Sequence, residues 1–177
     1  MLSLLQNSDA LVTAIVALGM GTAAVIDLRT RRIPNVLTAS IAAIGIGLAA
    51  AGLGRVGVGA ALLGCVLGLT FMLPGHIFGA TGAGDVKLLA AAGALLGPAD
   101  TLYAFLNTAI AGGVLALLVA VARRRLRHTV GSTARLLSGE LQAREAAREA
   151  VEHTSSENRF AYAPAIAIGV VLVALSW

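Results

Sequence analysis

Long uncharged segments alternate with short charged ones along most of this chain. The uncharged stretches are residues 10–26, 33–54, 56–84, 88–99, 101–122 and 160–177. A helix rises about 1.5 Å per residue and needs about 20 apolar residues to cross the hydrocarbon core of a bilayer. Four stretches reach that length directly, and stretch 10–26 does so if Asp9 and Asp27 lie near its ends. The pattern therefore predicts membrane-spanning helices.

The stretch 88–99 is too short to span a bilayer alone, because it would cover only about 18 Å as a helix. We extend it backwards, so that Asp85 and Lys87 lie below the lipid headgroups. The prediction is an all-α polytopic membrane protein with six transmembrane helices. Residues 1–177 then form a single membrane-embedded domain.

The distribution of basic residues predicts the orientation. With the amino terminus outside and six alternating helices, twelve Arg and Lys side chains fall in inside segments and only Arg55 falls outside. This asymmetry follows the positive-inside rule for short loops. We therefore expect both termini to lie outside, with Asp9 and Asp100 as ordinary residues at the outer helix ends.

Composition agrees with a bilayer as the solvent. The chain is 58% hydrophobic and 12% charged, with a mean hydropathy of +0.87, whereas soluble domains are about a quarter charged. One Cys and four Pro exclude disulfide-scaffold and collagen-like classes, and no cysteine zinc site can form within one chain. The net charge of +4 reflects inside Arg and Lys residues, so no nucleic acid partner is expected.

Thirteen of the 22 charges lie within residues 123–159. We predict that these residues form a charged cytoplasmic loop between the fifth and sixth spans. The pairs Glu140–Arg144 and Arg148–Glu152 have the i, i+4 spacing that stabilises an exposed helix. This helix is either solvated or lies on the membrane surface.

Small residues recur at four-residue spacing within the predicted spans. The pairs are Gly45 with Ala49, Gly64 with Gly68, and Gly93 with Gly97. Small residues at this spacing allow helix backbones to approach closely in lipid. Tight helix packing is the expected role of these glycines.

Two aspartates, Asp27 and Asp85, are predicted to lie at the same inner membrane face. An ionisable side chain within a span costs about 2.5–3.5 kcal/mol on insertion scales and is a functional candidate by default. The structural alternatives are a helix-end carboxylate paired with Arg31 for Asp27, and a helix N-cap for Asp85.

The approach to Asp85 carries a further signal. Glycine occupies positions 79, 82 and 84, and Lys87, the only lysine of the chain, follows two residues after the aspartate. Glycines remove side chains from this flank, so an extended peptide could come close to the carboxylate. An N-cap role alone does not call for such an approach.

The segment from Gly82 to Leu88 strongly resembles the Gly-x-Gly-Asp signature of the type IV prepilin peptidases, which are intramembrane aspartic proteases. The segment from Asp27 to Asn35 also resembles the first motif of this family, in which an aspartate ends helix one and is followed by basic residues. A looser likeness lies in the segment 160–169, which has Ala161 and Ala163 where members often have Pro and Gly.

The resemblance implies that Asp27 and Asp85 are the two catalytic aspartates. Gly82 and Gly84 then match the signature glycines, and Lys87 matches the basic residue that follows them, so these three are candidates for substrate binding or for the loop. No metal and no cofactor is implied. The expected activity is removal of the basic leader peptide from prepilins, whose apolar helix lies in the membrane lipid.

The resemblance also implies a location in the bacterial inner membrane, with the active site facing the cytoplasm. The small format looks like the enzymes that serve tight-adherence (Flp) pili. The cysteine tetrad of the zinc domain in larger members, which is linked to methylation of the new pilin amino terminus, is absent from a chain with one Cys. Methyltransferase activity is therefore not expected.

Two other classes of function compete with a peptidase. In a non-enzymatic membrane protein, Asp27, Asp85 and Lys87 would form a proton or ion pathway, although transporters usually have repeated halves and charges at the midplane. A passive helical scaffold would explain the small residues but not the two inner aspartates.

Overall fold

The computed structural model describes residues 2–79, 81–122 and 162–177. These residues form helices and no strands. The helices are α1 (Leu2–Thr30), α2 (Asn35–Ala50), α3 (Val58–Ile77), α4 (Ala83–Leu96), α5 (Pro98–Ala122) and α8 (Ala163–Leu175). The all-α prediction is confirmed for this part of the chain, whereas the predicted helix in the 123–159 loop lies outside the described residues.

The helices differ in their ability to cross a bilayer. Within the described residues, three are long and apolar enough by length and composition: 9–30 in α1, 58–77 in α3, and 98–118 in α5. The apolar helices α2 and α8 are shorter, and α4 has only 14 residues. Six spans therefore remain a prediction, as does the location of the termini outside.

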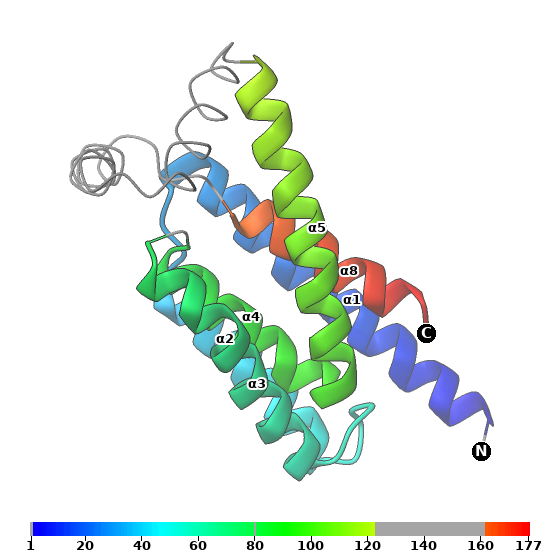
Figure 1. The fold of residues 1–177 in the computed structure, drawn as a ribbon. Helices are drawn as coiled ribbons and strands as arrows, with labels where there is room; N and C mark the ends of the chain where they lie inside the picture. Colours follow the sequence, from blue (N-terminus) through cyan, green and yellow to red (C-terminus); the bar gives the residue numbers. More distant parts are fainter. Residues whose placement is uncertain (1, 80, 123–161) are drawn as a thin grey trace.

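Successive helices run in alternating directions, so the two chain ends lie at the same end of the bundle (Figure 1). Asp27 lies in the last turn of α1 and Asp85 in the first turn of α4. Both aspartates are therefore at the bundle end opposite to the chain termini. The order of the helices thus places both aspartates at the same end of the bundle, as the sequence predicted.

The short helix α4 is the most enclosed helix of the described fold. From Asp85 to Leu96, all of its residues except Lys87 are buried. It packs mainly on α3 and α2 and also contacts α5 and α8. A helix of only 14 residues is therefore compatible with a membrane protein here, because α4 is surrounded by neighbouring helices and does not itself have to cross the bilayer in contact with lipid.

Glycines in α3 let it approach the backbone of α4. A Cβ atom on Gly64 would overlap the carbonyl of Gly93, and one on Gly68 would lie 2.6 Å from the carbonyl oxygen of Leu89. On α2, a Cβ on Gly45 would lie 2.9 Å from the carbonyl carbon of Ala94. The predicted role of these small residues in close helix packing is confirmed.

The remaining helices form a second group in which α8 packs on both α1 and α5. A Cβ on Gly169 of α8 would lie 2.6 Å from the backbone nitrogen of Thr108 in α5. The hydroxyl of Thr13 in α1 donates to the carbonyl of Ala174 at 3.2 Å. Asp27 thus belongs to one group of helices and Asp85 to the other, and α4 contacts both α8 and α1 of the other group.

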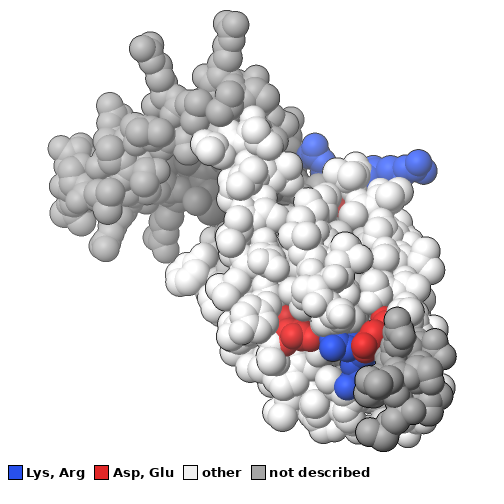
Figure 2. All heavy atoms as spheres, turned by 90° about the vertical axis from the view of Figure 1, so that its right-hand side faces the viewer, with Lys and Arg blue, Asp and Glu red and all other residues white. Residues whose placement is uncertain are grey.

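Arg55 holds the opposite end of the bundle together. Its Nε donates to Oδ1 of Asp9 at 2.8 Å, its Nη1 lies 3.3 Å from Oδ2 of Asp100, and its guanidinium stacks 3.7 Å from the ring centroid of Trp177. Trp177 also donates its indole N–H to Asp100 at 3.0 Å. Figure 2 shows basic atoms between acidic ones on this face. Asp9 and Asp100 therefore form ion pairs with Arg55, whereas the sequence analysis treated them as ordinary residues at the helix ends.

We expect Arg55→Ala to lower the free energy of unfolding by about 1–2 kcal/mol, since two part-exposed ion pairs and one cation–π contact are lost. Thermal unfolding in detergent micelles measures this loss. The matched control is Arg29→Ala, which removes an exposed arginine at the other end. An equal loss in both variants would show that the Arg55 contacts have no particular role in stability.

Candidate active site

Asp27 is buried near the carboxyl-terminal end of α1, with 6% of its surface exposed. Its Oδ2 accepts a hydrogen bond from the backbone N–H of Ala163 at 3.2 Å. The backbone N–H of Arg31, which has φ 52°, donates to the carbonyl of Asp27 at 2.7 Å and ends the helix. Asp27 is therefore a buried helix-end carboxylate that a second helix, α8, holds through a backbone N–H.

Asp85 is also 6% exposed, and it is the third residue of α4. The N-cap is Gly82, whose backbone N–H donates to Oδ2 of Asp85 at 2.9 Å. The sequence-based alternative of Asp85 as the N-cap is therefore wrong. The reason is that the glycine already has the extended backbone that an N-cap needs, so the helix starts two residues before Asp85.

The start of α8 contacts one of the two aspartates, because Ala163, the first residue of α8, donates its backbone N–H to Asp27. No residue of the segment 160–169 was assigned to the site from the sequence, since its likeness to the family motif is loose.

The two signature glycines lie against different neighbours. A Cβ on Gly82 would lie 3.1 Å from Oδ2 of Asp85, and one on Gly84 would lie 3.1 Å from Cβ of Ile33. Ile33 belongs to the connection between α1 and α2. These glycines therefore let the α4 start lie close to both the carboxylate and the α1–α2 connection.

Lys87 lies on the exposed side of the α4 start. Its Nζ donates to Oδ1 of Asn35, the first residue of α2, at 2.9 Å. Because α4 turns Lys87 outwards and Asp85 inwards, the lysine does not share the buried environment of the aspartate. It stands at the outer edge of the candidate site.

Hydrogen bonds tie the connection between α3 and α4 to the last turn of α3. Nδ1 of His76 lies 3.1 Å from the carbonyl oxygen of Thr81, and the backbone N–H of Thr81 donates to the carbonyl of Gly75 at 3.1 Å.

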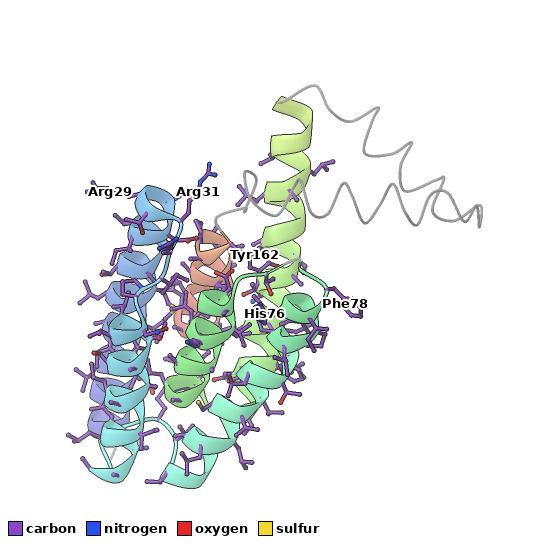
Figure 3. All side chains as sticks on the ribbon, turned by 90° about the vertical axis from the view of Figure 1, so that its left-hand side faces the viewer. Arg29, Arg31, His76, Phe78 and Tyr162 are labelled. Carbon is purple, nitrogen blue, oxygen red and sulfur yellow. The ribbon has the colours of Figure 1, made fainter. Side chains whose placement is uncertain are left out.

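Figure 3 shows Arg29, Arg31, His76, Phe78 and Tyr162 at one end of the bundle. Phe78 is 82% exposed there. This end therefore combines basic, aromatic and carboxyl groups.

Among the described residues, no group of three or more His, Cys, Asp or Glu is placed to hold a metal ion. The groups buried at this end of the bundle are two carboxyls, each of which accepts a hydrogen bond from a backbone N–H. In general, two carboxyls that share one proton can serve as general base and general acid.

Comparison with known proteins identifies a family. The sequence model of the type IV leader peptidase family matches residues 14–117, which is more than half of the chain and includes both aspartates. No curated protein and no solved structure matches the chain. The family match and the three long apolar helices together indicate a membrane protein.

Proposed function

This chain belongs to the type IV leader peptidase family, and we propose that it is an aspartic endopeptidase that removes the basic leader from type IV-like prepilins. The observation that carries the proposal is the burial of Asp27 and Asp85 at one end of the helical bundle, where Asp27 accepts a hydrogen bond from the start of α8. Buried carboxyls at one site are the groups that peptide hydrolysis by activated water requires.

In the proposed reaction, one carboxyl of the pair is ionised and the other is protonated, because two close carboxylates cannot both be charged cheaply. The ionised group takes a proton from water as the water oxygen attacks the carbonyl carbon. The protonated group gives its proton to the amide nitrogen as the C–N bond breaks. The pair titrates as a unit, so neither role is assigned to one aspartate at rest.

The proposed substrate has a basic leader and an apolar helix, so the bond that is cut lies where the helix enters the bilayer. We place this site at the cytoplasmic face of the bacterial inner membrane, since the basic residues near Asp27 and Asp85 follow the positive-inside rule. We propose the prepilins of Flp pili as its substrates. Cleavage without methylation is the proposed activity, because the single Cys cannot supply a cysteine tetrad.

Gly82 and Gly84 are proposed to admit the extended leader beside Asp85, and Lys87 to contact the substrate at the edge of the site. We expect Lys87→Gln to raise the KM for a prepilin about threefold to tenfold and to leave kcat within about twofold, because a charge-assisted hydrogen bond contributes about 1 kcal/mol or more. Steady-state kinetics with purified enzyme measure both constants. A fall in kcat with an unchanged KM would contradict a binding role.

The proposed function is tested by co-expressing the chain with a candidate Flp-type prepilin and measuring the pilin mass. Cleavage shortens the pilin by its leader and fixes the position of the cut. A vector without the peptidase gene is the matched control for processing by the host. An unchanged precursor mass across a panel of type IV-like prepilins would contradict the proposal, provided that the chain is inserted in the membrane.

A further inference from the structure

The first residues of α2 and α4 meet at the bundle end that holds the two aspartates. Both helices begin at that end and run side by side in the same direction (Figure 1). Nζ of Lys87, near the start of α4, lies 2.9 Å from Oδ1 of Asn35, the first residue of α2. The two residues are 52 positions apart in the chain. This hydrogen bond therefore joins the segment that follows Asp27 to the segment that contains Asp85.

A second contact holds the α1–α2 connection against the start of α4. A Cβ on Gly84 would lie 3.1 Å from Cβ of Ile33, and Ile33 also packs against the buried core. Residues 33 and 35 thus lie against residues 84 and 87, which precede and follow Asp85 in the chain. Packing therefore fixes where Asn35 lies relative to α4, in addition to the hydrogen bond from Lys87.

The backbone of Asn35 is fixed from both sides. Pro34, the N-cap of α2, has φ −62° and ψ 134°, and its ring restricts φ. The carbonyl of Asn35 accepts a hydrogen bond at 3.1 Å from the hydroxyl of Thr38, which is buried. Lys87, by contrast, is exposed and has a flexible four-carbon stem. The amide oxygen of Asn35 is therefore the fixed partner, and it restricts where the ammonium group lies.

The acceptor is a neutral amide, and this preserves the charge of the lysine. Within the part of the chain that the structure describes, Lys87 forms no ion pair. An ammonium group has three N–H donors, and the bond to Asn35 uses one of them. We infer that Asn35 is a positioning residue that holds the Lys87 ammonium toward an oxygen acceptor of the substrate without neutralising it. The inference rests on the proposed function, in which Lys87 contacts the prepilin at the edge of the site.

The first test needs no substrate. Lys87 is the only lysine of the chain, so protein labelled with ¹³C at lysine Cε gives one such signal in its NMR spectrum. Asn35→Leu removes the acceptor, so this signal should shift and become narrower as the side chain gains mobility. Ser40→Leu is the matched control on α2, since the Ser40 hydroxyl donates to a carbonyl of its own helix, and it should leave the signal unchanged. An identical lysine signal with and without Asn35 would overturn the inference.

The second test measures substrate binding. We expect Asn35→Leu to raise the KM for a prepilin about threefold to tenfold with kcat within about twofold, as for Lys87→Gln. The double variant should have the KM of Lys87→Gln alone, because the two residues act through one contact. Ser40→Leu should retain both constants. An unchanged KM in Asn35→Leu, or KM effects that multiply in the double variant, would overturn the positioning role.

Asn35→Asp separates a positioning role from a merely structural one. Asp keeps the size of Asn, still accepts the hydrogen bond from Lys87, and is favourable in the first turn of a helix, so the melting temperature should not fall. The new ion pair neutralises the ammonium, so we expect KM to rise about threefold or more. Attraction between the added negative charge and the basic leader would act in the opposite direction. An unchanged or lower KM would show that Asn35 only ties α2 to α4, and would overturn the inference.

The two kinds of measurement also separate this inference from the proposed function. If the unaltered enzyme cleaves no prepilin, the proposed function fails and the substrate-binding role of Asn35 fails with it. The lysine signal then still decides whether Asn35 holds Lys87. If the unaltered enzyme cleaves prepilin and Asn35→Leu changes neither the signal nor KM, only the inference about Asn35 is overturned.

Discussion

Replacing Asp27 or Asp85 by Asn is expected to abolish leader removal while the protein still inserts and folds. Asn has nearly the same size as Asp and can still accept the hydrogen bonds that Ala163 and Gly82 donate. It cannot take or give a proton in the reaction, and general acid–base groups typically contribute 10²–10⁴-fold. We therefore expect kcat/KM to fall about 10³-fold or more in either variant, as measured by the mass of the processed pilin.

The chain provides matched controls for this experiment. Asp9→Asn and Asp100→Asn make the same chemical change at the far end of the bundle, where both carboxyls pair with Arg55. These variants should process the prepilin at the rate of the unaltered enzyme, with only a small loss of thermal stability. Normal processing by the Asp27 and Asp85 variants would remove the aspartic mechanism and favour an ion or proton pathway for these groups.

The sequence predicted the helices well because the physical signal is strong. In lipid, a backbone must satisfy its own hydrogen bonds, so an uncharged run of sufficient length is a helix. The helices α1, α3 and α5 follow from this argument alone. The start of α4 was harder, because Gly82 and Asp85 are both acceptable near a helix N-terminus, and only the backbone geometry separates the N-cap from the third residue.

The candidate site was predictable only in part, for a similar reason. Asp27 and Asp85 were indicated by the cost of an ionisable group near the membrane interior. The contact from α8 carries no such signal, because the donor to Asp27 is the backbone N–H of Ala163, which is 136 positions away in the chain and belongs to another helix. A contact of this kind follows from tertiary packing rather than from any local pattern.

The close contact between α3 and α4 leads to the largest expected effect on stability. Gly64→Ala adds a single methyl group, but that group would overlap the carbonyl of Gly93, which belongs to the backbone and cannot rotate away. Overpacking typically costs about 1–3 kcal/mol, and a backbone obstacle places this variant at or above the upper end. We expect a clear fall in melting temperature, measured in detergent micelles, together with a lower yield of folded protein.

The glycine at position 59 provides the matched control on the same helix. A Cβ on Gly59 would meet no atom within 4 Å, and Ala is favoured over Gly in a helix by up to about 1 kcal/mol. Gly59→Ala should therefore be neutral or slightly stabilising, in contrast to Gly64→Ala. Because α4 carries Asp85 at its first turn, displacing this helix also moves one carboxyl relative to the other. Gly64→Ala should accordingly lose activity even at temperatures where it remains folded, and full activity there would show that the α3–α4 contact does not set the position of Asp85.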